Sequence, residues 1–287
     1  VLSEAVGDRP VLTIDGRKGE VAVDRVTWRG SVRGLGTDEL RLDGINRVPG
    51  LIRNCGGIGD EPTDLPLHDF TCTDDDETVA FTPEFGERTP SGEGLEVLVD
   101  DRGFVTSVRQ ERGHEVPSGG FSVQAIGDDV DDLSALVGGS HRLRLTTELV
   151  DERSKAVNLR ASDHVVNGGP LLIDDGRAEV TAARDGMVHA DNPGFFYAWG
   201  HKRHPRTIAG IDDAGRTVLI TVDGRQADTL GLSLQEAADV ARSLGLVEAI
   251  NLDGGGSTTM VVGDEIVNSP SGGAERAIGD AVLVLPR

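Results

Sequence analysis

A run near the C-terminal end of the chain combines the residue types that catalysis by a carboxylate requires. It spans 251–259 and reads Asn-Leu-Asp-Gly-Gly-Gly-Ser-Thr-Thr. The apolar run 247–252 leads into it, so we expect Asp253 at the tip of a strand, where a rigid element aims its carboxylate. The glycines 254–256 permit positive φ angles and let backbone amides approach a ligand closely. The pattern predicts an active-site turn, with an ordinary hairpin turn as the alternative.

A second carboxylate, Asp223, follows the apolar run 217–222 and opens the polar cluster 223–226. A helix is predicted between the two acids, because Ser233 begins a Ser-x-x-Glu capping box. In a strand–helix–strand unit the strands often run parallel, side by side or one strand apart, so their C-terminal ends meet at one edge. Two carboxylates facing one bond are the usual apparatus of glycoside hydrolysis. For Asp223 alone, a simple Asp-Gly turn is the alternative.

Further polar residues beside the apolar runs are candidates for binding a substrate. Arg206 lies among cations in an acidic chain, and a fixed guanidinium beside a glycine loop is a good receptor for a phosphate oxygen. A salt-bridged surface patch is the other interpretation of Arg206. Asn251 and Asn167 could hold sugar hydroxyls or satisfy their own turns. Ser257 and Thr258 add hydroxyls, but no His lies in a pattern that would activate Ser257 as a nucleophile.

Composition argues against several classes of partner. The chain has 28 Lys and Arg against 49 Asp and Glu, a formal net charge of −21, which opposes binding to nucleic-acid phosphates. No apolar run approaches the ~20 residues that a membrane-spanning helix needs. Neither His-Glu-x-x-His nor Cys-x-x-Cys is present, so no zinc site and no cofactor are predicted. The acidic run 74–77 leaves a divalent cation such as Ca²⁺ open, although such a run is more often a solvated turn and this one lacks the EF-hand spacing.

The elements that must position these residues are mostly short strands separated by Gly, Asp and Asn turns. We predict strands at 11–14, 21–23, 40–42, 77–82, 94–99, 104–109, 121–126, 142–150, 207–211, 217–222, 247–252, 259–262 and 280–285, with helices at 128–137 and from Leu234 to a stop at Gly245. The pattern predicts an α+β fold with mixed or antiparallel sheets and few helices. We expect one compact domain over 1–287, with a strand-rich N-terminal part, 1–164, and a motif-bearing core, 165–287.

Two features of the chain favour an exported protein. Cys55 and Cys72 lie in a loop-like region, where a bridge would be worth ~3 kcal/mol, with two buried thiols as the alternative. The sequence starts at Val1 without an initiator Met, which is typical of a processed chain. Together they predict a secreted protein.

The ordered motifs resemble those of the phosphodiester glycosidase family. The resemblance rests on 251–257 behind a capped helix, with Arg206-Thr207 and Asp223-Gly224 upstream and Glu275-Arg276 before the last predicted strand. It extends from about 165 to 285, and before that only 44–46 takes part. The resemblance implies hydrolysis of the bond between a sugar's anomeric carbon and a phosphodiester. It places these residues in or beside the pocket: Arg206, Asp223, Asn251, Asp253, Ser257 and Arg276, with Gly168, Gly254, Gly255 and Gly256 shaping the walls.

The leading hypothesis is therefore a secreted bacterial hydrolase of a sugar-1-phosphodiester in a cell-wall or capsular glycan. One alternative keeps the two-carboxylate chemistry without phosphate, as a glycoside hydrolase of a wall polysaccharide. The other is a non-catalytic carbohydrate-binding protein, which the 3% aromatic content disfavours because sugar-binding surfaces usually rely on aromatic platforms.

Overall fold

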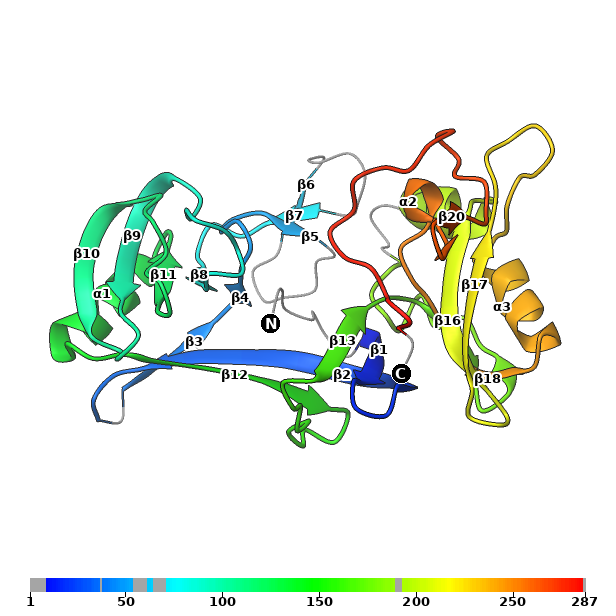
Figure 1. Cartoon of the computed structure of the whole chain (residues 1–287). Helices are drawn as coiled ribbons and strands as arrows, with labels where there is room; N and C mark the ends of the chain where they lie inside the picture. The colour runs from blue at the N-terminus through cyan, green and yellow to red at the C-terminus, as the bar shows by residue number, and fades with distance from the viewer. Residues whose placement is uncertain (1–8, 37, 54–60, 64–70, 189–192, 286–287) are drawn as a thin grey trace. The chain divides into compact units, whose positions relative to one another are not determined.

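Two compact units make up the part of the chain that the computed structural model describes, which is residues 9–36, 38–53, 61–63, 71–188 and 193–285. Among these residues, unit 1 runs from Val26 to Asn158, and unit 2 combines Arg9–Arg25 with the chain from Leu159 onward. The division after Asn158 lies close to the boundary predicted after residue 164. The single domain over the whole chain stays a prediction. Figure 1 labels the elements of both units.

Within the described residues, unit 1 contains one helix and three groups of mostly antiparallel strands, which are a five-stranded sheet, a three-stranded sheet and two strands that pair with one long strand. Its elements are β3 (Glu39–Leu42), β4 (Gly44–Ile45), β5 (Ile52–Arg53), β6 (Glu61–Thr63), β7 (Thr71–Thr73), β8 (Thr78–Phe81), β9 (Gly92–Val99), β10 (Val105–Arg112), β11 (Phe121–Ala125), α1 (Asp129–Gly139) and β12 (Arg144–Asp151). One sheet has the order β10-β9-β11-β8-β4, in which only the β4–β8 pairing is parallel. The long strand β2 (Glu20–Arg33) begins in unit 2 and pairs with β12 and β3 in unit 1.

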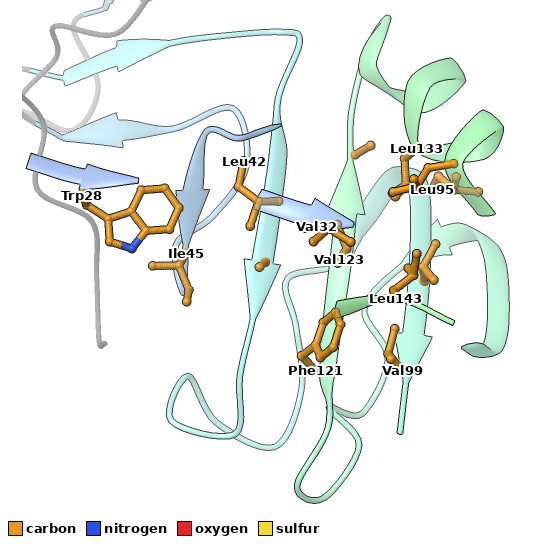
Figure 2. Close-up of a cluster of buried hydrophobic side chains, with 14 residues drawn as sticks. Trp28, Val32, Leu42, Ile45, Leu95, Val99, Phe121, Val123, Leu133 and Leu143 are labelled. Carbon is orange, nitrogen blue, oxygen red and sulfur yellow. The ribbon is translucent and has the colours of Figure 1, made fainter. Parts of the chain in front are cut away.

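The core of unit 1 is a cluster of fourteen buried apolar side chains from β2, the sheet and α1 (Figure 2). Leu133 and Leu136 lie three positions apart on α1, so both reach the same side of the helix and are buried. Trp28 is 6% exposed, which places the largest side chain of β2 in this core. The predicted helix at 128–137 is thereby confirmed.

Unit 2 carries every predicted site residue, and these residues are organised around its largest sheet, which is antiparallel. The unit consists of β1 (Arg9–Asp15), β13 (Asp163–Asn167), β14 (Leu171–Asp174), β15 (Arg177–Ala178), α2 (Pro193–Phe196), the π-helical turn η1 (Tyr197–His201), β16 (Arg206–Asp212), β17 (Thr217–Val222), α3 (Leu234–Ser243), β18 (Leu246–Asn251), the 3₁₀ turn η2 (Gly255–Ser257), β19 (Val261–Val262) and β20 (Glu265–Ile266). The strand order is β15-β14-β18-β16-β17.

The two faces of this sheet are covered by different elements. Helix α3 lies beside this sheet (Figure 1). It buries its apolar side, including Leu234 and Ala238, in a cluster with Ile208 of β16. Ala209, the next residue of β16, packs with Leu12 of β1 in a second cluster, because successive strand residues point to opposite faces. The predicted capping box is present at Ser233.

The predictions for the last part of the chain are wrong in part. The strand predicted at 280–285 does not form, and Leu283, Val284 and Leu285 are 74%, 79% and 74% exposed. The run has strand-like composition, but strand formation depends on pairing and packing, and no described strand pairs with it. The strand predicted at 259–262 is reduced to Val261–Val262.

The α+β class with mostly antiparallel sheets and few helices is confirmed. Cys72 is buried in unit 1, whereas Cys55 lies outside the described residues, so the pairing of the two stays a prediction. Among the helices within the described ranges, none combines the length and apolar character needed to cross a bilayer.

Candidate active site

The two candidate acids follow strands that end at the same edge of the unit 2 sheet. Strand β16 lies between β17 and β18 and is antiparallel to both, so β17 and β18 run parallel to each other, one strand apart. Val222 pairs with Arg206, and the amide of Leu252 donates to Thr207 O at 2.8 Å. Asp223 and Asp253 therefore follow these strands on either side of the start of β16. The strand–helix–strand pattern in the sequence predicts this arrangement.

The glycine turn lies directly against the chain that enters β16. Gly255 N donates to Pro205 O at 2.9 Å, and a Cβ on Gly254 would lie 2.8 Å from the same oxygen. Gly255 adopts a φ of +58°, which disfavours any residue with a side chain. The glycines are thus required for a close approach of two backbones and for a left-handed residue at the start of η2.

Asp253 presents its carboxylate to solvent at this turn. Its side chain is 80% exposed, and the nearest cation is Arg276, whose Nη2 lies 3.9 Å from Asp253 Oδ2. The same Nη2 donates to Ser257 Oγ at 2.5 Å. Arg276 also borders the glycine turn, since a Cβ on Gly256 would lie 3.3 Å from its Nη1. An accessible carboxylate and an accessible guanidinium therefore meet at one turn.

Asp223 differs from Asp253, because its carboxylate already has hydrogen-bond donors. Asn268 Nδ2 donates to Oδ1 at 2.9 Å, and Ser269 N donates to Oδ1 and Oδ2 at 2.9 and 3.0 Å. Asn268 Nδ2 also donates to Thr258 O at 3.0 Å. Asp223 thus holds the segment after β20 against the end of the glycine turn. Both oxygens of the Asp223 carboxylate therefore already accept hydrogen bonds from the protein.

The guanidinium of Arg206 is bound by main-chain carbonyls. The residue is 2% exposed, with Nε donating to Leu232 O at 2.9 Å and Nη2 to Trp199 O at 2.7 Å. Burial, and next the positive charge of Arg225, lowers the pKa of Arg206 to about 10. Arg206 ties η1 to the loop before α3, and its predicted contact with phosphate stays a prediction.

Arg225 is a cation of this site that the sequence analysis did not select. Its guanidinium nitrogens lie 3.2 Å from the position that a Cβ on Gly255 would occupy. Its Nε donates to His204 Nδ1 at 3.1 Å. The polar cluster 223–226 is visible in the sequence, yet nothing in its spacing distinguishes Arg225 from its neighbours. The positive φ of 58° and the contact with the glycine turn are tertiary features.

The candidates Asn251 and Gly168 join the glycine turn to the segment before β14. Asn251 is 3% exposed, and its Nδ2 donates to Gly169 O and to Leu252 O, each at 2.9 Å. Its Oδ1 has no partner within the described residues. A Cβ on Gly168 would lie 2.8 Å from Asn251 O, so the absence of a side chain is required there.

Two other candidates occupy structural positions. Asn167, which precedes Gly168 in the chain, pairs with Val11 in the β1–β13 ladder. Thr258 is 1% exposed, and its Oγ1 accepts a hydrogen bond from Thr207 Oγ1 at 3.3 Å. Their predicted substrate contacts stay predictions.

The described residues contain no group of three or more His, Cys, Asp and Glu side chains arranged to hold a metal ion. The acidic run 74–77 belongs to unit 1. Within it Glu77 binds the guanidinium of Arg47 and accepts from Gly50 N at 2.6 Å, and Asp76 Oδ1 accepts from Asp128 N at 2.7 Å. The run is thus engaged in internal bonds, and the divalent cation stays an untested prediction.

A family model described as phosphodiester glycosidase matches residues 93–285. The chain belongs to the phosphodiester glycosidase family. The match extends well before residue 165, where the resemblance in the sequence begins, so it includes much of unit 1 as well as the whole glycine turn.

Curated proteins are similar to this chain over short segments. The SPbeta prophage-derived uncharacterized protein YomE of Bacillus subtilis is 37% identical over 82 residues, 29% of this chain and 13% of that protein. N-acetylglucosamine-1-phosphodiester alpha-N-acetylglucosaminidase of Mus musculus is 44% identical over 66 residues, 23% of this chain and 13% of that protein. The aligned segments therefore span about an eighth of these relatives.

Solved structures share the fold over nearly the whole chain. A predicted exported protein from Burkholderia pseudomallei K96243 has a TM-score of 0.81 at 27% identity, covering 94% of this chain and 56% of that one. A hypothetical protein from Synechocystis has a TM-score of 0.64 at 20% identity, over 93% of this chain and 43% of the other, and shows the fold alone.

Proposed function

We propose that this phosphodiester glycosidase hydrolyses the bond between the anomeric carbon of a sugar and the phosphate of a phosphodiester. The observation that carries the proposal is the exposed carboxylate of Asp253 at a turn bordered by two guanidinium groups. Arg276 lies beside Gly256 and Ser257, and Arg225 lies beside Gly255. The pair of cations suits an anionic phosphodiester, because charge-assisted hydrogen bonds to phosphate are the strong ones.

The assigned roles follow from where charge changes during the reaction. The leaving group departs as a phosphomonoester and gains negative charge, which the guanidinium groups at the glycine turn stabilise. Asp253, exposed at the turn, attacks the anomeric carbon or removes a proton from the attacking water. Which of these two it does decides whether the sugar configuration is retained.

The occupied carboxylate of Asp223 favours a phosphate leaving group over an alcohol. An alkoxide must be protonated as it leaves, which is why glycosidases keep one carboxylic acid protonated. A phosphomonoester has a second pKa near ~6 and leaves without that help. Because Asp223 accepts from Asn268 and Ser269, it suits a supporting role. This disfavours the alternative of an ordinary wall-polysaccharide hydrolase, and the 3% aromatic content disfavours simple carbohydrate binding.

The second part of the proposal concerns where the protein acts and on which glycan. The similarity to a predicted exported protein of Burkholderia supports action outside the cytoplasm. We propose a cell-wall or capsular glycan joined through sugar-1-phosphodiesters. N-acetylglucosamine is the first sugar to test, because the names of the animal relatives specify it.

The deciding experiment compares two substrates with the same sugar, an alkyl sugar-1-phosphodiester and an aryl glycoside. We expect the protein to release free sugar from the phosphodiester and to be much slower on the aryl glycoside. Asp253→Asn should lower kcat/KM on the phosphodiester by at least ~10²-fold. Asp264→Asn, an exposed Asp in the turn between β19 and β20, is the matched control. Turnover of the aryl glycoside alone, or an unaffected Asp253→Asn variant, would overturn the proposal.

A further inference from the structure

His204 makes two hydrogen bonds that together specify one state of its imidazole. Its Nε2 lies 2.6 Å from Ala198 O, and its Nδ1 lies 3.1 Å from the Nε of Arg225. A carbonyl oxygen only accepts, so Nε2 carries the hydrogen. A guanidinium only donates, so Nδ1 is the bare acceptor. Both contacts exist at once only when the imidazole is neutral and protonated on Nε2.

Arg225 depends on this contact for its position. Among the residues that the structure describes, no carboxylate pairs with its guanidinium, and its φ of 58° holds the backbone in a sparsely populated conformation. The side chain is exposed at its end, where it borders Gly255. A long, exposed side chain without a fixed partner samples many rotamers, so a single acceptor that holds Nε restricts where the two terminal nitrogens point.

Three cations among the described residues act on His204. Arg225 reaches it from the end of β17, Arg206 from β16, and Lys202 from the segment after η1. Burial lowers the pKa of His204, the bond to Ala198 O opposes this, and the three cations lower the pKa further. The neutral form is therefore favoured around neutral pH.

We propose that His204 is a positioning residue, which as a neutral imidazole holds the Arg225 guanidinium beside Gly255 for the substrate phosphate. Protonation of Nδ1 would remove the acceptor and add a cation next to Arg225, so the guanidinium would be released in acid. The inference rests on the proposed function, since it assigns the phosphate end of that substrate to Arg225.

Kinetics of single and double variants test the coupling between the two residues. His204→Ala should lower kcat/KM for the phosphodiester about tenfold, the size expected when one positioned hydrogen bond to a group that stabilises the leaving phosphate is lost. His204→Asn, which can present Oδ1 to Arg225, should restore most of the loss. The double variant His204→Ala/Arg225→Ala should be no worse than Arg225→Ala alone, because residues that act as one unit are not additive. His164→Ala, at an exposed His on β13, is the control.

Additive losses in the double variant, or failure of His204→Asn to improve on His204→Ala, would overturn the positioning role. A general loss of folding would instead lower the thermal stability of the His204→Ala variant, and its loss of activity would be independent of whether Arg225 is present. Thermal unfolding of each variant separates these results.

A measurement without catalysis keeps this inference distinct from the proposed function. Nitrogen-15 NMR of the imidazole groups in the full chain should show His204 as the Nε2–H tautomer at neutral pH. In the Arg225→Ala variant the pKa of His204 should rise, because a neighbouring cation and a donor to Nδ1 are both gone. The Nδ1–H tautomer, or an unchanged pKa in Arg225→Ala, would overturn the contact. An inactive wild-type protein with the expected NMR result would overturn the proposed substrate alone.

Discussion

Asn251 shows how one side chain at the glycine turn donates hydrogen bonds to two backbone segments. Its amide nitrogen donates to the carbonyls of Gly169 and Leu252, which lie on different segments. The residue is 3% exposed, so water does not replace these bonds. Asn251 therefore fixes the position of the backbone where β18 ends and the glycine turn begins, and with it the position of Asp253.

Asn251→Asp should destabilise the protein by about 2–4 kcal/mol. The buried carboxylate would face two carbonyl oxygens that accept hydrogen bonds from the Asn251 amide in the wild type. Urea unfolding at neutral pH measures this change in the free energy of unfolding. The matched control is Asn158→Asp, which adds the same charge at an exposed position. Equal stability of the two variants would show that the hydrogen bonds of the Asn251 side-chain amide contribute nothing to the free energy of unfolding.

At the scale of elements, helix α3 begins and ends at residues that are determined by the sequence immediately around them. Ser233 Oγ accepts from Glu236 N at 3.2 Å, and Glu236 Oε2 accepts from Ser233 N at 2.9 Å. Gly245 follows the helix with a φ of +88°. Arg203, which lies just before β16, binds the carboxylate of Glu236. The cap thus joins the helix to the chain that enters the central strand.

The cap predicts a pH dependence of stability. The bond from Arg203, and next the bond from Ser233 N, lowers the pKa of Glu236 from 4.5 to about 2. A carboxyl group whose folded pKa lies below its unfolded value stabilises the fold above the unfolded pKa and loses that contribution as pH falls. The difference in stability between wild type and Glu236→Gln should therefore shrink between pH ~4.5 and ~2.

Chemical unfolding of the two proteins across that pH range makes the measurement. Arg203→Ala should reduce the same pH dependence, because it removes the largest cause of the lowered pKa. A constant difference between wild type and Glu236→Gln at every pH would contradict the assignment of the cap as an ionised pair.

At the scale of the whole molecule, the described chain divides into two units, each of which contains one of the two tryptophans. Trp28 lies in the core of unit 1, and Trp199 packs at the edge of the α3 cluster in unit 2. Unit 1 also buries Glu96, which is 0% exposed and accepts from Thr89 Oγ1 and Ser122 Oγ, each at 2.7 Å. All the candidate site residues belong to unit 2.

Each tryptophan should report mainly the unfolding of its own unit. Glu96→Gln turns an acceptor-only group into one with an amide donor facing other donors, and it should destabilise unit 1 by about 3 kcal/mol. In single-tryptophan variants, made with Trp199→Phe or Trp28→Phe, the shift should be larger when Trp28 is the reporter. Asn251→Asp should shift the Trp199 signal more. Equal shifts from both reporters would show one cooperative unit, as the predicted single domain requires.

Much of the fold and of the candidate site was predictable because its determinants are local. The capping box, the stop at Gly245, and the apolar runs of β16, β17 and β18 depend on residues that are close in sequence. The shared edge for Asp223 and Asp253 followed from those elements and from the parallel direction that a strand–helix–strand connection favours. The motif order also predicted the phosphodiester glycosidase family.

Tertiary contacts determined the remaining features, since partners from distant segments decide them. The apolar run at 280–285 has strand-like composition and no described strand partner, so composition alone misled. Donors from residues 268 and 269 distinguish the bound Asp223 from the exposed Asp253. Arg206 is distinguished by its burial, and Arg225 by its position beside Gly255. The residue types in the sequence therefore determined which chemistry is available, and long-range packing decided which of those groups are accessible to perform it.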